Sequence, residues 1–369
     1  MSNGGLSSQT VTVFGGGNGW GKRIAEAFCS LGAKPLVIEK EAVTADIITA
    51  IESSSIVFIA IPDHAINALL LEFHTQLQDK IILDCATNKT GFSESLIKLA
   101  DCGASICSTH PMAASSGVLR GQNALIMPIG ENAAAALAVA KQLFQHLAMH
   151  GELFNFSKHT DLMIIVQMLP HIIQRLSIDA IGQGLLEHNI PIDALENLAS
   201  ANYLLAELGL GRVAAQRADV SAGIIATALN EPAGQQLVER LQTSLQSIKR
   251  ASNSRDALSN LFNHSVQQLD PNGQWRLQMA DKTEAALIRL GNLRSRSLTI
   301  EAPNRIGMLR DILSVLANHQ IDMTALDSQL ISEADGSEWV NFDIAISNEY
   351  VPFSAMADEL AKIAACFKP

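Results

Sequence analysis

The chain has 369 residues, of which 48% are hydrophobic, and a formal net charge of -11. This length predicts two or three domains, because a single hydrophobic core rarely serves more than roughly 300 residues. The negative charge argues against a nucleic acid partner, since it repels a phosphate backbone and no basic stripe with interleaved aromatic residues compensates for it.

The cysteines and the N-terminal segment restrict the compartment. Five cysteines without a C-x-x-C pair fit neither a disulfide framework nor a zinc site, so we expect reduced thiols, mostly buried, and no metal. The segment MSNGGLSSQT lacks the basic and apolar regions of a secretory signal, and no run of about 18 uncharged apolar residues is present. We therefore expect a cytoplasmic protein that makes no contact with a membrane.

The first region, residues 1–151, alternates short β-rich runs with helical stretches. The runs are VTVFG, PLVIE, SIVFIAIP, KIILD, ASICSTHP and ALIMPI. Each is continuous and apolar, which is typical of parallel strands covered by helices on both faces. This pattern predicts a doubly wound α/β domain.

A glycine-rich turn joins the first of these strands to the first helix. Its candidate cofactor-binding residues are Gly15, Gly16, Gly17, Asn18, Gly19 and Gly21. Such a turn lets backbone N–H groups approach a pyrophosphate at the positive end of a helix, which is the Rossmann-type arrangement. Asn18 stands where G-x-G-x-x-G has its second glycine, but Asn tolerates left-handed geometry and Gly19 can absorb the tight approach.

An acid follows at the spacing that this arrangement requires. Glu39 ends the second strand 18 residues after Gly21, where a carboxylate can accept hydrogen bonds from a ribose diol. A carboxylate also repels a 2′-phosphate, which favours NAD over NADP. The alternative is that the glycines serve only close packing of the helix on the strand.

The second region, residues 152–292, loses the β signal. A run compatible with a helix follows Ser157 and extends to about Glu187, and only Pro170, which we expect to kink it, interrupts the run. The block is too long and apolar for a single layer of helices, so we expect an all-α domain that packs against a twin in a homodimer.

The third region, residues 293–369, predicts a small α+β domain. Its elements in order are LTIEA as a strand, GMLRDILSVLANH as a helix, DMTALDSQLIS and EWVNFDIAI as strands, and SAMADELAKIAACF as a helix. The order is βαββα, and the chain leaves room for only a short final strand or none.

Two short motifs in the first region follow strands. The strand KIILD leads to Thr87 and Lys89, and the strand ASICST leads to His110 and HPM. Ligands of open α/β sheets bind at the carboxyl ends of the strands. A hydroxyl, an amine and an imidazole can therefore converge on one substrate.

Together these features resemble the prephenate and arogenate dehydrogenases. The likeness is carried by GGGNGWG, Glu39, the D-x-x-(S/T)-x-K segment DCATNK, HPM, HTDLMIIVQMLPH and ANYLLAELGLGRVAAQ, over nearly all of residues 11–250. It implies NAD-dependent oxidative decarboxylation of prephenate to 4-hydroxyphenylpyruvate in tyrosine biosynthesis. An arogenate dehydrogenase that forms tyrosine directly is the alternative.

The resemblance also implies roles for single residues of the first region. His110 matches the histidine that accepts the proton of the substrate's C4 hydroxyl, and a neutral imidazole suits this task. Thr87 stands where the family usually has serine and would orient this histidine or the substrate hydroxyl. Lys89 would bind cofactor or substrate, or lie solvated in its loop.

In the helical region, the resemblance points to a substrate-binding face. Arg212 matches an arginine that binds a substrate carboxylate, with an ordinary ion pair as the alternative. His171 matches a second histidine on the substrate side. Met163, Gln167 and His171 are spaced by four residues, which places them on one face of an α-helix that can line the pocket. His159 we expect to be structural.

The third region resembles an ACT domain, a small fold that binds amino acids. Asn304, Arg305 and Gly307 lie where such domains hold the ligand's amino and carboxylate groups. Tyrosine is therefore a possible effector, and the alternative is a dimerisation module without a ligand. Two further hypotheses remain: a non-catalytic NAD-binding regulator, suggested by Asn18 and Thr87, and another oxidoreductase, which would not need HPM, DxxTxK and Arg212 together.

Overall fold

The computed structural model describes residues 6–198, 200–215, 218–294, 297–332, 337–348 and 350–367. The chain divides into two compact units, one formed by Met1–Ile173 with Ala218–Arg240 and the other by Gln174–Arg217 with Leu241–Pro369. The helical region expected at 152–292 contributes to both units.

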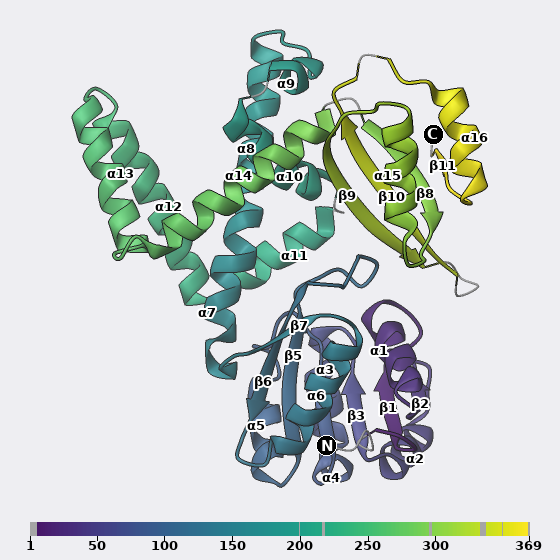
Figure 1. Ribbon diagram of the computed structural model, residues 1–369. Helices are drawn as coiled ribbons and strands as arrows, with labels where there is room; N and C mark the ends of the chain where they lie inside the picture. Colours follow the sequence, from purple (N-terminus) through teal and green to yellow (C-terminus); the bar gives the residue numbers. More distant parts are fainter. Residues whose placement is uncertain are drawn as a thin grey trace. The chain divides into compact units, whose positions relative to one another are not determined.

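The first unit contains a seven-stranded sheet of order β2-β1-β3-β4-β5-β6-β7 (Figure 1). The chain steps from β1 to β2 on one side and to β3 on the other, so the order reverses beside β1, which is where such sheets bind ligands. The strands are β1 (Thr10–Phe14), β2 (Lys34–Ile38), β3 (Ile56–Ile59), β4 (Ile81–Asp84), β5 (Ser105–Pro111), β6 (Asn123–Ile129) and β7 (His150–Leu153).

One strand runs against the expected direction. All pairs are parallel except β5 with β6, which is antiparallel, so the expectation of parallel strands is wrong for the run ALIMPI. A parallel return needs a crossover of a dozen or more residues, usually a helix, and residues 112–122 form none. The short connection therefore turns the chain back.

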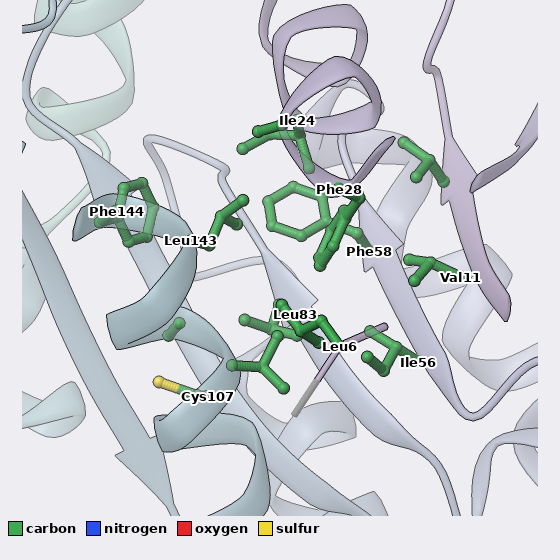
Figure 2. Close-up of a cluster of buried hydrophobic side chains, with 14 of the residues drawn as sticks. Leu6, Val11, Ile24, Phe28, Ile56, Phe58, Leu83, Cys107, Leu143 and Phe144 are labelled. Atoms are coloured by element: carbon green, nitrogen blue, oxygen red, sulfur yellow. The ribbon is translucent and has the colours of Figure 1, made fainter. Parts of the chain in front are cut away.

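Helices cover both faces of this sheet, as the continuous apolar runs predict. Alternate strand residues point to opposite faces: Val13 and Phe58 belong to one buried cluster, whereas Phe14 and Ile59 belong to the other. Figure 2 shows the first cluster, to which α1 contributes Phe28. The helices are α1 (Gly19–Ser30), α2 (Thr44–Ser53), α3 (Asp63–Glu72), α4 (His74–Leu77), α5 (Ser93–Asp101) and α6 (Ala134–His146).

The helical run after the sheet contains a π-helical turn rather than a simple kink. It consists of a 3-10 turn η1 (Phe156–Lys158), α7 (His159–Met163), the π turn η2 (Ile164–Met168) and α8 (Leu169–Glu187). Pro170 has no N–H to continue the α-helical ladder, and a π turn just before it accommodates that loss. The first unit includes this run as far as Ile173, and within that unit α11 (Ala218–Leu229) packs against η2.

By length and composition alone, the run Phe156–Glu187 would be able to cross a membrane, with a mean hydropathy of 1.2 in its most apolar window. Only 11% of that window is buried. The expectation of no membrane contact stays a prediction.

The second unit joins further helices to a small sheet. Within it, α10 (Ala201–Ala215) packs on α14 (Gln274–Arg294). The other helices of this region are α9 (Asp193–Leu198) and α13 (Arg255–Leu269), together with the later parts of α8 and α12 (Pro232–Ala251), which both begin in the first unit.

The C-terminal sheet is antiparallel, with the order β11-β8-β10-β9. One face packs on the two helices through Ile300, Ile344, Ile312 and Leu360. A two-residue final strand is present, so the full order is βαββαβ, the split βαβ arrangement. The elements are β8 (Ser297–Pro303), α15 (Met308–Asn318), β9 (Met323–Ser332), β10 (Glu338–Ile346), α16 (Phe353–Lys362) and β11 (Cys366–Phe367).

All five cysteines are free thiols, as expected. The expectation that most are buried is wrong, because Cys29, Cys102 and Cys366 are exposed. Cys107 is buried in the sheet, and Cys85 is half-buried in the loop after β4.

Candidate active site

The glycine turn after β1 is shaped by close contacts that exclude side chains. Gly15 has a left-handed φ of 74°, and a Cβ there would lie 2.6 Å from the carbonyl oxygen of Ala60. A Cβ on Gly21 would lie 2.0 Å from the carbonyl oxygen of Gly15. These two glycines therefore serve the packing of α1 on the strands, as the structural alternative supposes.

Two other glycines of the turn have a different environment. A Cβ on Gly19 would meet only the Ser115 Oγ atom, at 3.7 Å, so its surroundings leave room for a ligand. Gly19 also begins α1, with a φ of 54°, whereas Asn18 is extended at a φ of -150°. The left-handed position thus falls on Gly19, and the tolerance of Asn18 for that geometry is not used.

Glu39 is held at this turn by a hydrogen bond. The backbone N–H of Gly17 donates to Glu39 Oε1 over 2.5 Å, and a Cβ on Gly17 would crowd that oxygen. The carboxylate, the start of α1 and the open surroundings of Gly19 thus gather at one end of the sheet. This donor and acceptor set fits a dinucleotide, with the pyrophosphate at the helix start and the ribose diol at the carboxylate.

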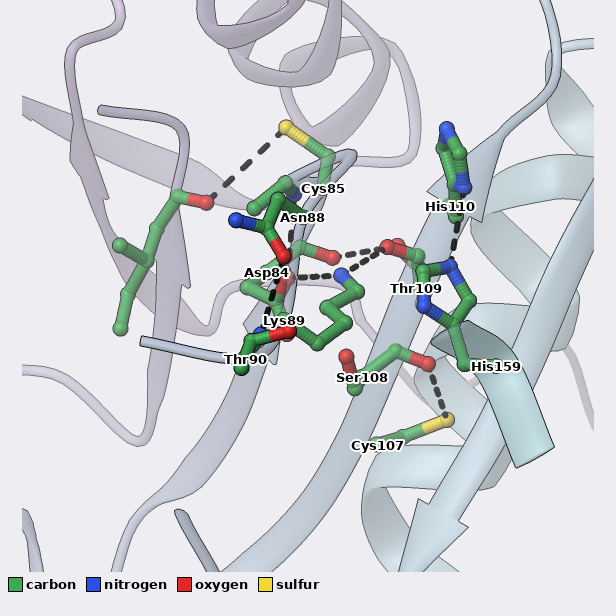
Figure 3. A network of polar contacts seen from close by, with 12 residues as sticks. Asp84, Cys85, Asn88, Lys89, Thr90, Cys107, Ser108, Thr109, His110 and His159 are labelled. Atoms are coloured by element: carbon green, nitrogen blue, oxygen red, sulfur yellow. Dashed lines mark hydrogen bonds and ion pairs between the residues drawn. The ribbon is translucent and has the colours of Figure 1, made fainter. Parts of the chain in front are cut away.

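The DxxTxK segment forms a buried polar network between β4 and β5 (Figure 3). Asp84, 1% exposed, forms an ion pair with Lys89, 2% exposed. Lys89 Nζ also donates to the carbonyl oxygen of Thr109 over 2.8 Å, and Thr109 Oγ1 donates to the carbonyl oxygen of Asp84 over 2.5 Å. Lys89 therefore lies inside the protein rather than in solvent, and its amine ties the loop after β4 to the strand β5.

His110 lies near the end of β5 and contacts a second histidine. The His110 Nδ1 atom is 3.1 Å from His159 Nε2, and both side chains are buried (Figure 3). His159 begins α7, so the first turn after the sheet brings it to the strand. Sequence reasoning expected His159 to be structural and missed this contact, because 49 residues separate the two rings.

Both rings are held in the neutral form. Burial, followed by the charge of Lys89 and the neighbouring His159, keeps the pKa of His110 well below its ordinary value. Burial and the charge of Lys89 lower the pKa of His159 to about 3. Two neutral imidazoles can share one hydrogen bond, and a neutral His110 can accept a proton at neutral pH.

The cysteine beside this network is not a nucleophile. Burial and the charge of Asp84 raise the pKa of Cys85 to about 12, with Lys89 acting in the opposite direction. A thiol that stays protonated at neutral pH is a poor nucleophile. Cys85 is therefore not a candidate for the reactive group of this site, and the catalytic role of the His110 imidazole stays a prediction.

Thr87 occupies the loop after β4 and is exposed. Within the described part of the chain, the ring of His110 has His159 as its hydrogen-bond partner rather than Thr87. The hydrogen bond to the ring in this structure is thus made by His159, and the orienting role of Thr87 toward the ring or a substrate hydroxyl stays a prediction.

The π turn changes the face that the helical motif presents. Met163 and Met168 are both buried and lie five residues apart, whereas Gln167 is half-buried. The α-helical spacing assumed for Met163, Gln167 and His171 thus does not run through this segment. His171 is half-buried, and its Nδ1 atom lies 3.2 Å from Ser221 Oγ on α11.

The remaining candidates lie in the second unit. Arg212 is exposed on α10, and its role in substrate binding stays a prediction. In the turn before α15, Gly307 has a left-handed φ of 87°. Asn304 Nδ2 donates to Glu338 Oε2 over 2.7 Å, and Arg305 Nη2 donates to Asp311 Oδ2 over 2.8 Å. These two side chains are thus engaged with carboxylates of their own sheet and helix.

Part of the first unit is similar to a known protein family. Residues 27–148 match the family model described as "Prephenate dehydrogenase, nucleotide-binding domain". No curated protein matches the chain in sequence.

Solved structures share the fold at low identity. A Synechocystis arogenate dehydrogenase is 16% identical, with a TM-score of 0.52, 71% of this chain and 99% of that one covered. An Aquifex aeolicus prephenate dehydrogenase is 15% identical, with a TM-score of 0.50, and the match covers 73% of this chain and 100% of that one. A Corynebacterium glutamicum protein described as a candidate prephenate dehydrogenase is 15% identical, with a TM-score of 0.54, and the match covers 76% of this chain and 90% of that one. Residues 27–148 are therefore similar to the nucleotide-binding domain of the prephenate dehydrogenase family, and the solved structures share the fold.

Proposed function

We propose that the chain is an NAD-dependent prephenate dehydrogenase, which oxidises and decarboxylates prephenate to 4-hydroxyphenylpyruvate. The observation that carries the proposal is a buried, neutral histidine at the carboxyl end of β5 in a domain similar to this family. The carboxyl ends of β1, β4 and β5 meet at one edge of the sheet, so the glycine turn, the DxxTxK loop and His110 share that edge.

NAD is the cofactor that the glycine turn fits best. The start of α1 and the Gly19 backbone would receive the pyrophosphate, and Glu39 would accept hydrogen bonds from the ribose diol. The same carboxylate would repel the 2′-phosphate of NADP. When bound, NAD supplies the hydride acceptor for oxidation at C4 of the substrate.

The residues of the chain then have a limited task. His110 accepts the proton of the C4 hydroxyl, and the ketone that forms at C4 is an electron sink for the bond to the departing CO2. Aromatisation of the ring drives that loss. Arg212 would bind a substrate carboxylate through its guanidinium fork, with His171 and Gln167 on the substrate side. The two substrate carboxylates would favour the protonated form of His110 while the reaction proceeds.

The test is formation of NADH by the full chain with prephenate, with arogenate as the alternative substrate and NADP as the alternative cofactor. We expect turnover with prephenate and NAD, and its loss in His110→Asn. His146→Asn, in an exposed histidine at the end of α6, is the matched control and should retain full activity.

The other outcomes separate the alternatives. Turnover with arogenate in place of prephenate would identify an arogenate dehydrogenase. Binding of NAD without reduction by either substrate would overturn an enzymatic role and favour an NAD-binding regulator.

A further inference from the structure

The hydrogen bond between His110 and His159 can run in either direction, depending on the tautomers of the two rings. Each neutral ring carries one hydrogen, and the facing atoms, His110 Nδ1 and His159 Nε2, form one hydrogen bond. One of these two atoms must therefore donate and the other accept. Two arrangements are possible, and they differ in the nitrogen of His110 that remains free.

Only one of the two arrangements leaves His110 with a free nitrogen that can act as a base. If His110 Nδ1 donates to His159, then His110 Nε2 carries a lone pair and can accept a proton. If His159 Nε2 donates instead, the hydrogen of His110 is on Nε2, and that atom has no lone pair for a substrate hydroxyl. In Figure 3, the Nε2 edge of His110 points away from His159.

We propose that His159 is the positioning residue of the reaction, which accepts a hydrogen bond from His110 Nδ1 and so keeps the lone pair of His110 on Nε2. The proposal rests on the function proposed above. It assigns to His159, on a helix outside the sheet, a task that the motif HPM alone cannot perform. His159 itself would not touch the reacting atoms.

The protonated form of His110 requires the same direction of the hydrogen bond, from His110 Nδ1 to His159 Nε2. After His110 accepts a proton, both of its nitrogens carry hydrogen, so Nδ1 can only donate, and the partner must be an acceptor. An arrangement with His159 already accepting needs no prior proton movement. The low pKa of His159, about 3, keeps its lone pair available throughout the neutral range.

Among the described residues, no group around the two rings fixes their tautomers through a further hydrogen bond. The Nδ1 atom of His159 is buried and has no hydrogen-bond partner among the described residues, so no other group there fixes the tautomer of His159. The charge that acts on both rings is that of Lys89, which is paired with Asp84 in the network between β4 and β5. Lys89 disfavours a charged form of either ring and does not select a tautomer by a direct bond.

The first test reads the tautomer without any substrate. The full chain, labelled with 15N in its histidine rings, is measured by long-range 1H–15N correlation at neutral pH, and His110→Gln and His159→Gln identify the two sets of signals. We expect His110 to show a protonated Nδ1 and an unprotonated Nε2. A protonated Nε2 on His110 would overturn the proposal, and this result does not depend on the substrate of the enzyme.

The second test uses two substitutions of His159. His159→Phe keeps a ring of similar size but cannot accept a hydrogen bond, and we expect kcat to fall by about 10- to 100-fold, with KM and NAD affinity changed less than about threefold. His159→Gln offers an amide oxygen as acceptor and should recover part of kcat; it also serves if the Phe variant does not fold.

The results of the two tests separate the two proposals. An unchanged kcat in a folded His159→Phe, with a fixed tautomer in the spectrum, would overturn the positioning role. Failure of the unaltered chain to reduce NAD with either substrate would overturn the proposed function, whereas the ring spectrum would still decide the tautomer.

Discussion

Lys89→Met removes one partner of the buried ion pair and isolates the carboxylate of Asp84. Both groups are almost inaccessible to solvent, at 2% and 1% exposure, and the substitution also leaves the Thr109 carbonyl without its amine donor. Breaking a buried pair by removing one partner costs about 3–5 kcal/mol, because the remaining charge stays desolvated. For a unit of this size, about 2–4 °C per kcal/mol gives a loss in Tm of roughly 6–20 °C.

The measurement is urea denaturation of the full chain followed by circular dichroism, with a thermal scan beside it. The double variant Asp84→Leu with Lys89→Met is the control, since an apolar pair of similar volume restores much of the lost stability. Lys98→Met, in a helix and without a buried partner, should change the free energy of unfolding by less than about 0.5 kcal/mol. A cost below about 1 kcal/mol for Lys89→Met would refute the reasoning.

Three further predictions concern the histidine pair, the cofactor and the turn. The folded pKa of His159 is lowered to about 3, below its unfolded value near 6.5, so its contribution to stability is present above pH 6.5 and is lost as pH falls toward 3. Between pH 7 and pH 5, the free energy of unfolding of His159→Gln should therefore fall less than that of the unaltered chain, by about 1–2 kcal/mol in denaturant titrations; equal slopes would contradict this. Glu39→Ala removes a charged acceptor for the ribose diol, so calorimetry should give an affinity for NAD that is about 10- to 100-fold lower. The variant should also discriminate less strongly between NAD and NADP. An unchanged affinity for NAD would show that the ribose binds elsewhere. Gly21→Ala should abolish NAD binding, because its Cβ would clash with the Gly15 carbonyl, whereas Gly182→Ala, with no atom within 4 Å of its new Cβ, should bind NAD normally; binding by Gly21→Ala would disprove the tight turn.

Tyrosine binding is the corresponding prediction for the C-terminal sheet. Calorimetry with tyrosine and phenylalanine separates an effector site from a dimerisation module, since heat from tyrosine that Arg305→Ala removes would support the former. Heat from neither amino acid would favour the latter. Homodimer formation through the helical region stays a prediction, for which exposed apolar side chains such as Leu176 and Leu186 would supply a surface, and sedimentation velocity measures it.

The local sequence pattern was enough to predict six of the seven strands of the first sheet and the position of Glu39 beside the glycine turn. It missed β7, an exposed strand of sequence HGEL that has no continuous apolar run. Continuous apolar runs marked β3, β4 and β5 as strands buried on both faces, whereas β2, from the run PLVIE, is largely exposed. The spacing of Glu39 from the glycine turn placed its carboxylate beside Gly17. The direction of β6 was missed because strand direction depends on the connection, and an apolar run such as ALIMPI fits either direction.

Features set by tertiary contacts were beyond the sequence pattern. A proline within a helix permits either a kink or a π turn, so Pro170 alone did not predict the five-residue spacing of Met163 and Met168. The contact between His110 and His159 needs the first turn after β7 to return to β5, which no periodicity encodes. Lys89 carried the right motif, but its burial follows from the ion pair with Asp84.

The most direct measurement of the central claim is the yield of both products from one reaction mixture. With prephenate and NAD, the chain should form NADH and 4-hydroxyphenylpyruvate in equal amounts, and His110→Asn should form neither above the uncatalysed rate while still binding NAD. Undiminished formation of both products by His110→Asn would contradict the assignment of this imidazole as the base.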